Sequence, residues 1–277
     1  MAKLHSDTDR EMIVTGDWLA AHLDDPAIRI VDTRKGDAYN LSHIAGAVGY
    51  KGSPFLREEG AIIAPDKFAD LMSRLGVGDD TTVIAYDDGN NLFAARLWWV
   101  LNYYGHRRVK VLNGGWDLWV AEGRPVDTAT VTPPEARFNS HRNDEWIADS
   151  QYVKASIGNS ERLILDVRGD SEWTGANPMG TKRGGHIPSA VQLEWTKTID
   201  PETKRFRPSA TLREMFKKLG ATPEKEMITY CQGGIRAAHT ALALRLAGFD
   251  KVRNYDGSWA EWGNREDLPI ERSETSS

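Results

Sequence analysis

The sequence predicts an α/β protein of two tandem domains, each with a central, mainly parallel sheet flanked by helices. Three observations support this. Segments of the first half recur in order in the second, short apolar runs alternate with helical patterns, and the chain is long enough for two units. The 277 residues suit two domains of about 100–150 residues each. The 40% hydrophobic and 27% charged residues are typical of globular domains with buried cores.

The internal repeat consists of four matching segments in the same order. The offset between matching residues is 134 at the first match and 143 at the second, so the second half carries nine extra residues within 169–185. This insertion is rich in glycine and predicts a loop. The matching segments are Ile30–Arg34 with Leu165–Arg168, His43–Val48 with His186–Val191, Thr82–Tyr86 with Glu226–Tyr230, and Asn113–Trp119 with Asp256–Trp262.

Short apolar runs without alternation predict strands of a parallel sheet that is covered on both faces. These strands are expected at Arg29–Asp32, Thr82–Tyr86, Leu163–Val167 and Met227–Tyr230. Apolar residues at helical spacing, followed by glycine, predict helices. The helices are expected at Pro65–Leu75, Thr211–Leu219 and Ala237–Ala247.

The domain limits follow from the repeat and from a polar connector that contains Pro133-Pro134. We expect a first domain over residues 1–130, a linker over 131–144 and a second domain over 145–277. In α/β sheets, ligands bind beyond the carboxyl ends of the strands. The functional site is therefore expected in a loop that follows a strand.

The net charge of −5 argues against general attraction to nucleic acid or to anionic membranes. An anionic substrate would need a local positive pocket. Met1–Glu11 is polar and lacks the apolar core of a signal peptide, and no apolar run approaches the roughly 20 residues that span a bilayer. We therefore expect a cytoplasmic protein without nucleic-acid or membrane partners.

The chain has one cysteine, Cys231. It cannot form an intrachain disulfide, and no cysteine cluster is present to bind zinc. The simplest interpretation is a small buried apolar side chain. However, Cys231 directly follows a predicted strand, and Gly233-Gly234 then precedes a predicted helix. Two glycines allow successive N–H groups to turn inward, and such a nest at a helix N-terminus favours a negative charge. We therefore expect Cys231 to be a reactive thiolate.

The cysteine loop, the segment Val252–Trp262 and the segment Tyr39–Ala47 together resemble tandem-domain rhodaneses and 3-mercaptopyruvate sulfurtransferases over about residues 12–270. In the segment Tyr39–Ala47, Ala45 stands where this family usually has proline. The resemblance implies two rhodanese-like domains of which only the second is catalytic, because Asp87 stands in the first half where Cys231 stands in the second.

The resemblance also implies a reaction. Cys231 would take the outer sulfur of a small anionic donor such as thiosulfate as a persulfide, and would pass it to cyanide, a thiol or an acceptor protein. No cofactor and no metal are implied. The expected donor-binding residues are Gln232, Gly233, Gly234, Ile235 and Arg236 of the loop, together with Arg183, which matches a basic residue near the cysteine in related enzymes.

Several alternatives remain open. Gln232 and Arg236 depart from the loop residues of well-studied relatives, which leaves 3-mercaptopyruvate as a possible donor, although the charge of Arg236 favours thiosulfate. The same loop would also serve a module that relays sulfur between proteins. A phosphatase or arsenate reductase would need a Cys-x5-Arg loop, whereas Cys231 and Arg236 are separated by four residues. Arg183 has a simpler interpretation as a solvated loop residue.

Residues that recur in both halves are expected to be structural, because the first half lacks the cysteine. They include His43 and His186, and the pairs Asp32/Arg34 and Asp166/Arg168.

Overall fold

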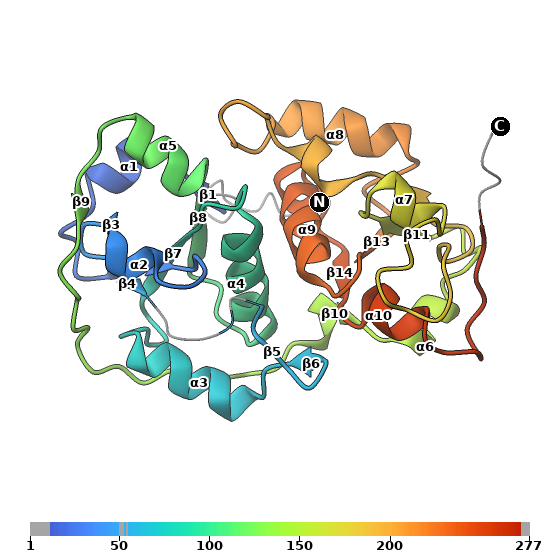
Figure 1. Cartoon of the computed structure of the whole chain (residues 1–277), viewed down its shortest axis with the longest axis horizontal. Coiled ribbons are helices and arrows are strands. Elements are labelled where there is room, and N and C mark those ends of the chain that lie inside the picture. The colour runs from blue at the N-terminus through green and yellow to red at the C-terminus, as the bar shows by residue number, and fades with distance from the viewer. Residues whose placement is uncertain (1–11, 50–52, 54, 273–277) are drawn as a thin grey trace, which may run out of the picture. The chain divides into compact units, whose positions relative to one another are not determined.

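The computed structural model describes residues 12–49, 53 and 55–272 (Figure 1). The segment Met1–Glu11, on which the expected absence of a signal peptide rests, lies outside the described residues. The chain forms two compact units. Unit 1 runs up to Arg57 and includes Ile63–Arg142 and Pro201–Phe206, whereas unit 2 comprises Glu58–Ile62, Asn143–Asp200 and the chain from Arg207 onward. The limits 1–130 and 145–277 stay predictions, and the two short segments that join the other unit were not foreseen.

Unit 1 contains a five-stranded sheet in the order β1-β8-β7-β2-β4, with every neighbouring pair parallel. A second, two-stranded sheet pairs β3 with β9. The elements are β1 (Ile13–Val14), α1 (Gly16–Ala20), β2 (Ile28–Asp32), α2 (Ala38–Leu41), β3 (His43–Ile44), β4 (Val48–Gly49), α3 (Pro65–Arg74), β7 (Thr82–Tyr86), α4 (Leu92–Tyr103), β8 (Val109–Leu112), α5 (Gly115–Ala121) and β9 (Val126–Asp127). The short strands β5 (Arg57–Glu58) and β6 (Ala61–Ile62) form a further two-stranded sheet.

Unit 2 repeats this topology in the order β10-β14-β13-β11-β12, again with every neighbouring pair parallel. Its elements are the 3₁₀ helix η2 (Asp144–Trp146), β10 (Ile147–Ala148), α6 (Ser150–Lys154), β11 (Arg162–Asp166), α7 (Asp170–Trp173), β12 (Val191–Gln192), the 3₁₀ helix η3 (Trp195–Thr198), α8 (Ser209–Lys218), β13 (Glu226–Tyr230), α9 (Ile235–Leu246), β14 (Val252–Tyr255) and α10 (Ser258–Trp262).

Helices cover both faces of the unit 2 sheet, as its apolar strands require. Helix α9 packs against β13 and β14, and α8 packs against α9, as can be followed in Figure 1. On the other face, Trp259 and Trp262 of α10 and Val153 of α6 share a buried apolar cluster with Ile164 and Ile228 of the strands. Unit 1 has the corresponding arrangement, with α4 on one face and α1 and α5 on the other.

The predicted fold class is confirmed: both halves are α/β units with a mainly parallel sheet between helices. The predicted strands and helices are present, with ends that differ by at most two residues. Strand β13 is central in its sheet and ends at Tyr230, which places Cys231 at the carboxyl edge. Within the described residues, no helix is long and apolar enough to cross a membrane.

Candidate active site

Cys231 lies between the end of β13 and the start of α9, and it is 1% exposed. Its backbone is held by the N-terminal end of α10. The Cys231 N–H donates to Ser258 Oγ at 3.1 Å, and the Cys231 carbonyl accepts from Trp259 N at 2.9 Å. The next carbonyl, of Gln232, accepts from Ala260 N at 2.9 Å. The repeated segment 256–262 therefore fixes the base of the cysteine loop.

Gly234 makes the turn into α9. Its φ of +79° lies in the left-handed region, and a Cβ there would come within 2.5 Å of Asp256 Oδ1. Asn254 Nδ2 donates to the Gly234 carbonyl at 2.9 Å. Only glycine fits this position without strain.

The backbone N–H groups of Gln232, Gly234, Ile235 and Arg236 have no acceptor among the described residues. The first N–H groups of a helix lack intrahelical partners, and together with a turned loop they form a site that favours an anion. The loop beside Cys231 therefore has donors available for a thiolate or for a negatively charged sulfur attached to it.

Unit 1 shows the same loop with an anion built in. Asp87 follows β7 as Cys231 follows β13, and its carboxylate is buried. Oδ1 accepts from the N–H groups of Gly89 at 2.7 Å and Asn91 at 3.0 Å, and Oδ2 accepts from Ala94 N at 2.7 Å. Burial raises the pKa of Asp87 to about 6, although the N–H bonds act in the opposite direction. This loop thus folds around a carboxylate that has no sulfur chemistry.

Arg236, in the first turn of α9, brings a cation to the cysteine. Its Nη1 and Nη2 donate to Glu172 Oε2 at 2.7 Å and Oε1 at 2.8 Å. Burial alone lowers the pKa of Arg236, but the hydrogen bond with Glu172 and the charge of the Cys231 sulfur together raise it. Arg236 is therefore paired with the Glu172 carboxylate five residues after the reactive cysteine in the chain.

Comparison with known proteins agrees with this arrangement. The rhodanese-like domain matches the chain twice, over residues 15–122 and 149–265. The chain belongs to the rhodanese family. It is 40% identical to a thiosulfate sulfurtransferase of Corynebacterium glutamicum, over 95% of this chain and 91% of that protein. It is 35% identical to the sulfur carrier protein TtuD of Thermus thermophilus, over 95% of this chain and 98% of that protein.

A solved structure shows the same fold. The SseA protein of Escherichia coli, described among 3-mercaptopyruvate sulfotransferases, superimposes with a TM-score of 0.79 at 30% identity, over 90% of this chain and 98% of that chain. The rhodanese chain described here is therefore a member of a sulfurtransferase family whose relatives bear the names of thiosulfate sulfurtransferases, a 3-mercaptopyruvate enzyme and a sulfur carrier.

Arg183, which we expected near the donor, has backbone partners in the structure. Its guanidinium donates to the carbonyls of Trp262 and Leu268, each at 2.9 Å, and also to that of Arg265. Arg183 thus stabilises the C-terminal end of α10, whereas Cys231 contacts the N-terminal end of that helix. A part for Arg183 in donor binding stays a prediction, and the function proposed below does not depend on it.

Gln232 joins the cysteine loop to the insertion. Its Nε2 donates to the Met179 carbonyl at 3.1 Å, and its Oε1 is buried without a partner among the described residues. Met179 is 50% exposed. The loop residues Gln232, Gly233, Gly234, Ile235 and Arg236 are thus brought together around Cys231. Their part in binding a donor stays a prediction.

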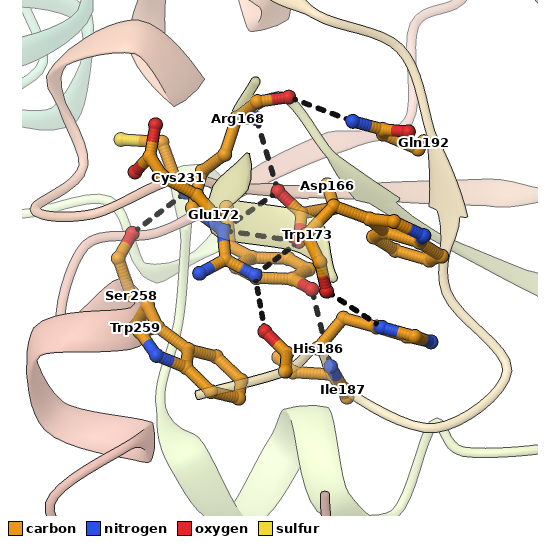
Figure 2. Close-up of polar contacts among 12 residues, drawn as sticks. Asp166, Arg168, Glu172, Trp173, His186, Ile187, Gln192, Cys231, Ser258 and Trp259 are labelled. Atoms are coloured by element: carbon orange, nitrogen blue, oxygen red, sulfur yellow. Dashed lines mark hydrogen bonds and ion pairs between the residues drawn. The ribbon is translucent and has the colours of Figure 1, made fainter. Parts of the chain in front are cut away.

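In unit 2, the repeated Asp–Arg pair and the repeated histidine have structural contacts, as we expected (Figure 2). Arg168 Nη2 donates to Asp166 Oδ2 at 2.6 Å and to the Gly185 carbonyl at 2.8 Å. His186 stacks on Trp173 with ring centroids 3.5 Å apart, and its Nδ1 is 3.1 Å from the Trp173 carbonyl. These contacts tie the strand end to the insertion.

Glu172 is the site residue that sequence reasoning missed. It lies in α7, is 7% exposed, and is separated from Arg236 by 64 residues. The repeat contained a signal for Glu172. Four residues after the shared Asp–Arg segment, the second half has a glutamate, whereas the first half has Ala38.

Among the described residues, no group of three or more His, Cys, Asp and Glu side chains is arranged to hold a metal ion.

Proposed function

We propose that this protein is a thiosulfate sulfurtransferase that carries sulfane sulfur on Cys231 as a persulfide. The observation that carries the proposal is the set of N–H groups around Cys231 that have no acceptor within residues 12–49, 53 and 55–272. Preorganised donors of this kind stabilise charge where it develops during a reaction. The family membership and the name of the Corynebacterium relative support the same activity.

In the first half-reaction, the Cys231 thiolate attacks the outer sulfur of thiosulfate. A new S–S bond forms, the bond between the two thiosulfate sulfurs breaks, and sulfite leaves with that electron pair. The outer sulfur stays on Cys231 and bears the negative charge. The N–H groups of Gln232, Gly234 and Ile235 have no acceptor in the described part of the chain, and we infer that they stabilise this charge.

In the second half-reaction, cyanide or a thiol attacks the outer sulfur of the persulfide. The bond between the two sulfurs breaks, and its electron pair returns to Cys231 as the thiolate. Thiocyanate or a new persulfide is released. On the protein, the negative charge stays on the Cys231 sulfur or on the sulfur attached to it in both half-reactions.

The choice of donor depends less on Arg236 than the sequence indicated. The charge of Arg236 is paired with Glu172 at 2.7 and 2.8 Å, so it does not stand alone beside the cysteine. The proposal of thiosulfate therefore relies on the N–H donors and on the relatives. Two alternatives follow from the names of TtuD and SseA: a protein-to-protein sulfur carrier and a 3-mercaptopyruvate sulfurtransferase.

Steady-state kinetics test the proposal and separate these alternatives. Thiocyanate formation from cyanide is measured with thiosulfate and with 3-mercaptopyruvate, for the wild type and for Cys231→Ser. We expect turnover with thiosulfate, a higher kcat/KM for thiosulfate than for 3-mercaptopyruvate, and none in Cys231→Ser. A higher kcat/KM for 3-mercaptopyruvate would replace the donor, and no turnover with either donor would favour the sulfur carrier.

A further inference from the structure

The ion pair of Glu172 and Arg236 is bidentate and largely buried. Its N–O distances are 2.7 and 2.8 Å, and the two side chains are 10% and 21% exposed. The pairing uses one N–H of each terminal nitrogen. Three of the five guanidinium N–H donors therefore remain, and the plane of the group is fixed.

The duplicated half is an internal control for what this pair does. Glu172 corresponds to Ala38, and each is followed by an aromatic ring, Trp173 or Tyr39, that stacks on a histidine. Arg236, the second residue of α9, corresponds to Phe93, the second residue of α4. The half that has Asp87 in place of the cysteine therefore lacks both members of the pair.

Other polar contacts at the same sheet edge are present in both halves. Arg34 pairs with Asp32 at 2.6 Å, just as Arg168 pairs with Asp166 at 2.6 Å. The fold thus needs the Asp–Arg pair in each unit, but forms without a Glu172–Arg236 pair in unit 1. The Glu172–Arg236 pair is therefore present only in the unit that has the cysteine, and the fold itself does not require it.

The pKa shifts of Glu172 and Arg236 show that each side chain stabilises the charge of the other. Burial by itself raises the pKa of Glu172, but Arg236 first and Arg168 next keep it below its usual value. Glu172 and Cys231 in turn raise the pKa of Arg236 against the effect of burial. Figure 2 shows the Glu172 carboxylate directed to the same side of the site as the Cys231 sulfur.

We propose that Glu172 is a positioning residue, which holds the guanidinium of Arg236 so that its remaining N–H donors face the sulfur of Cys231. This rests on the proposed function, because the charge to be held is that of the thiolate and of the persulfide. Without the carboxylate, Arg236 is free to turn towards water, away from the sulfur. Glu172 itself is not required to touch the donor.

The experiment uses alkylation of Cys231 by two reagents of similar size, neutral iodoacetamide and anionic iodoacetate. Because Cys231 is the only cysteine, every alkylation event reports on this site. The ratio of the two rate constants measures the positive charge that an incoming anion meets at the sulfur. A residue that only stabilises the fold changes both rates together and leaves the ratio unchanged.

We expect Glu172→Gln to lower the iodoacetate-to-iodoacetamide ratio by about fivefold, since the guanidinium is no longer held at the sulfur. Arg236→Gln should lower the ratio equally, and adding Glu172→Gln to it should cause less than about a twofold further change. Arg236→Lys keeps the charge but cannot pair bidentately, so it should also lower the ratio. It serves as a second variant if Glu172→Gln folds poorly.

Glu226→Gln is the matched control. Glu226 pairs with Arg253 at 2.6 Å with similar exposures of 18% and 21%, but it begins β13 whereas Cys231 follows its end. This variant should leave the ratio unchanged. A ratio that rises in Glu172→Gln would show that the carboxylate acts only by its own charge, and an unchanged ratio would show a structural role; either result overturns the proposal. Absence of persulfide in the wild type would instead overturn the proposed function, because alkylation requires no sulfur donor.

Discussion

Asp87 and Cys231 each follow the central strand of their sheet, but their loops differ in what the backbone N–H groups bind. The Asp87 carboxylate accepts three of them, at 2.7, 3.0 and 2.7 Å. Around Cys231, four N–H groups are unbonded within the described part of the chain. One duplicated loop thus contains its own anion, and the other is open to receive one.

Replacement of the Asp87 carboxylate by an amide should destabilise unit 1. In Asp87→Asn, an NH₂ group replaces one oxygen and faces an N–H donor, so at least one buried N–H is left unbonded. We expect a loss of about 2 kcal/mol in the free energy of unfolding, measured in urea. Exposed Asp88 supplies the control, since Asp88→Asn should change stability by less than about 0.5 kcal/mol. Equal effects of the two variants would contradict the described role of Asp87.

The stability contribution of Asp87 should also depend on pH. Its pKa is raised from 3.8 to about 6 in the folded protein. Between these values the folded state binds more protons than the unfolded state, so this contribution is present below pH about 4 and is lost as the pH rises through about 6. Asp87→Asn should therefore cost about 1 kcal/mol more at pH 5 than at pH 7. A cost that is larger at pH 7 would show that the pKa is lowered instead.

Gly234 and its neighbour Gly233 should respond differently to substitution by alanine. Gly234 has φ +79°, and a Cβ would lie 2.5 Å from Asp256 Oδ1, whereas a Cβ on Gly233 would meet nothing within 4 Å. We expect Gly234→Ala to lower stability by about 2 kcal/mol and to reduce thiocyanate formation, because the loop must shift. Gly233→Ala should fold with wild-type stability in the same urea titration. Wild-type activity in Gly234→Ala would contradict a rigid loop.

Arg183 should affect stability rather than donor binding. Its guanidinium donates to the carbonyls of Trp262, Leu268 and Arg265, so Arg183→Gln leaves carbonyls without donors. The expected loss is about 2 kcal/mol in unfolding free energy, with KM for thiosulfate unchanged within about twofold in the folded protein. If KM rose more than about tenfold while stability stayed constant, Arg183 would belong to the donor site after all.

The sequence predicted those features of the fold that depend on residues close together in the chain. Thr82–Tyr86 is a continuous apolar run and forms β7 with those ends, and the repeat located the position of Asp87. Cys231 was identified because its strand, its glycines and its helix are adjacent in the chain. Such signals depend on neighbours along the backbone.

Side-chain partners from distant segments were not predictable in this way. Arg236 was expected to add a positive charge to the loop, but the sequence did not show that a carboxylate 64 residues away pairs with it. Arg183 was expected near the donor because it matches a basic residue of related enzymes, and the sequence did not show that its N–H groups reach carbonyls at the end of a helix. Sequence shows which charges are present, whereas only the fold shows which acceptor each of them reaches.

The most direct test of the account is the intact mass of the protein after incubation with thiosulfate and removal of the small molecules. Because Cys231 is the only cysteine, a single added sulfur atom identifies the persulfide without further mapping. We expect a gain of about 32 Da that disappears on addition of cyanide and is absent in Cys231→Ser. An unchanged wild-type mass, with cyanide and thiosulfate still converted to thiocyanate, would contradict a sulfur-carrying cysteine.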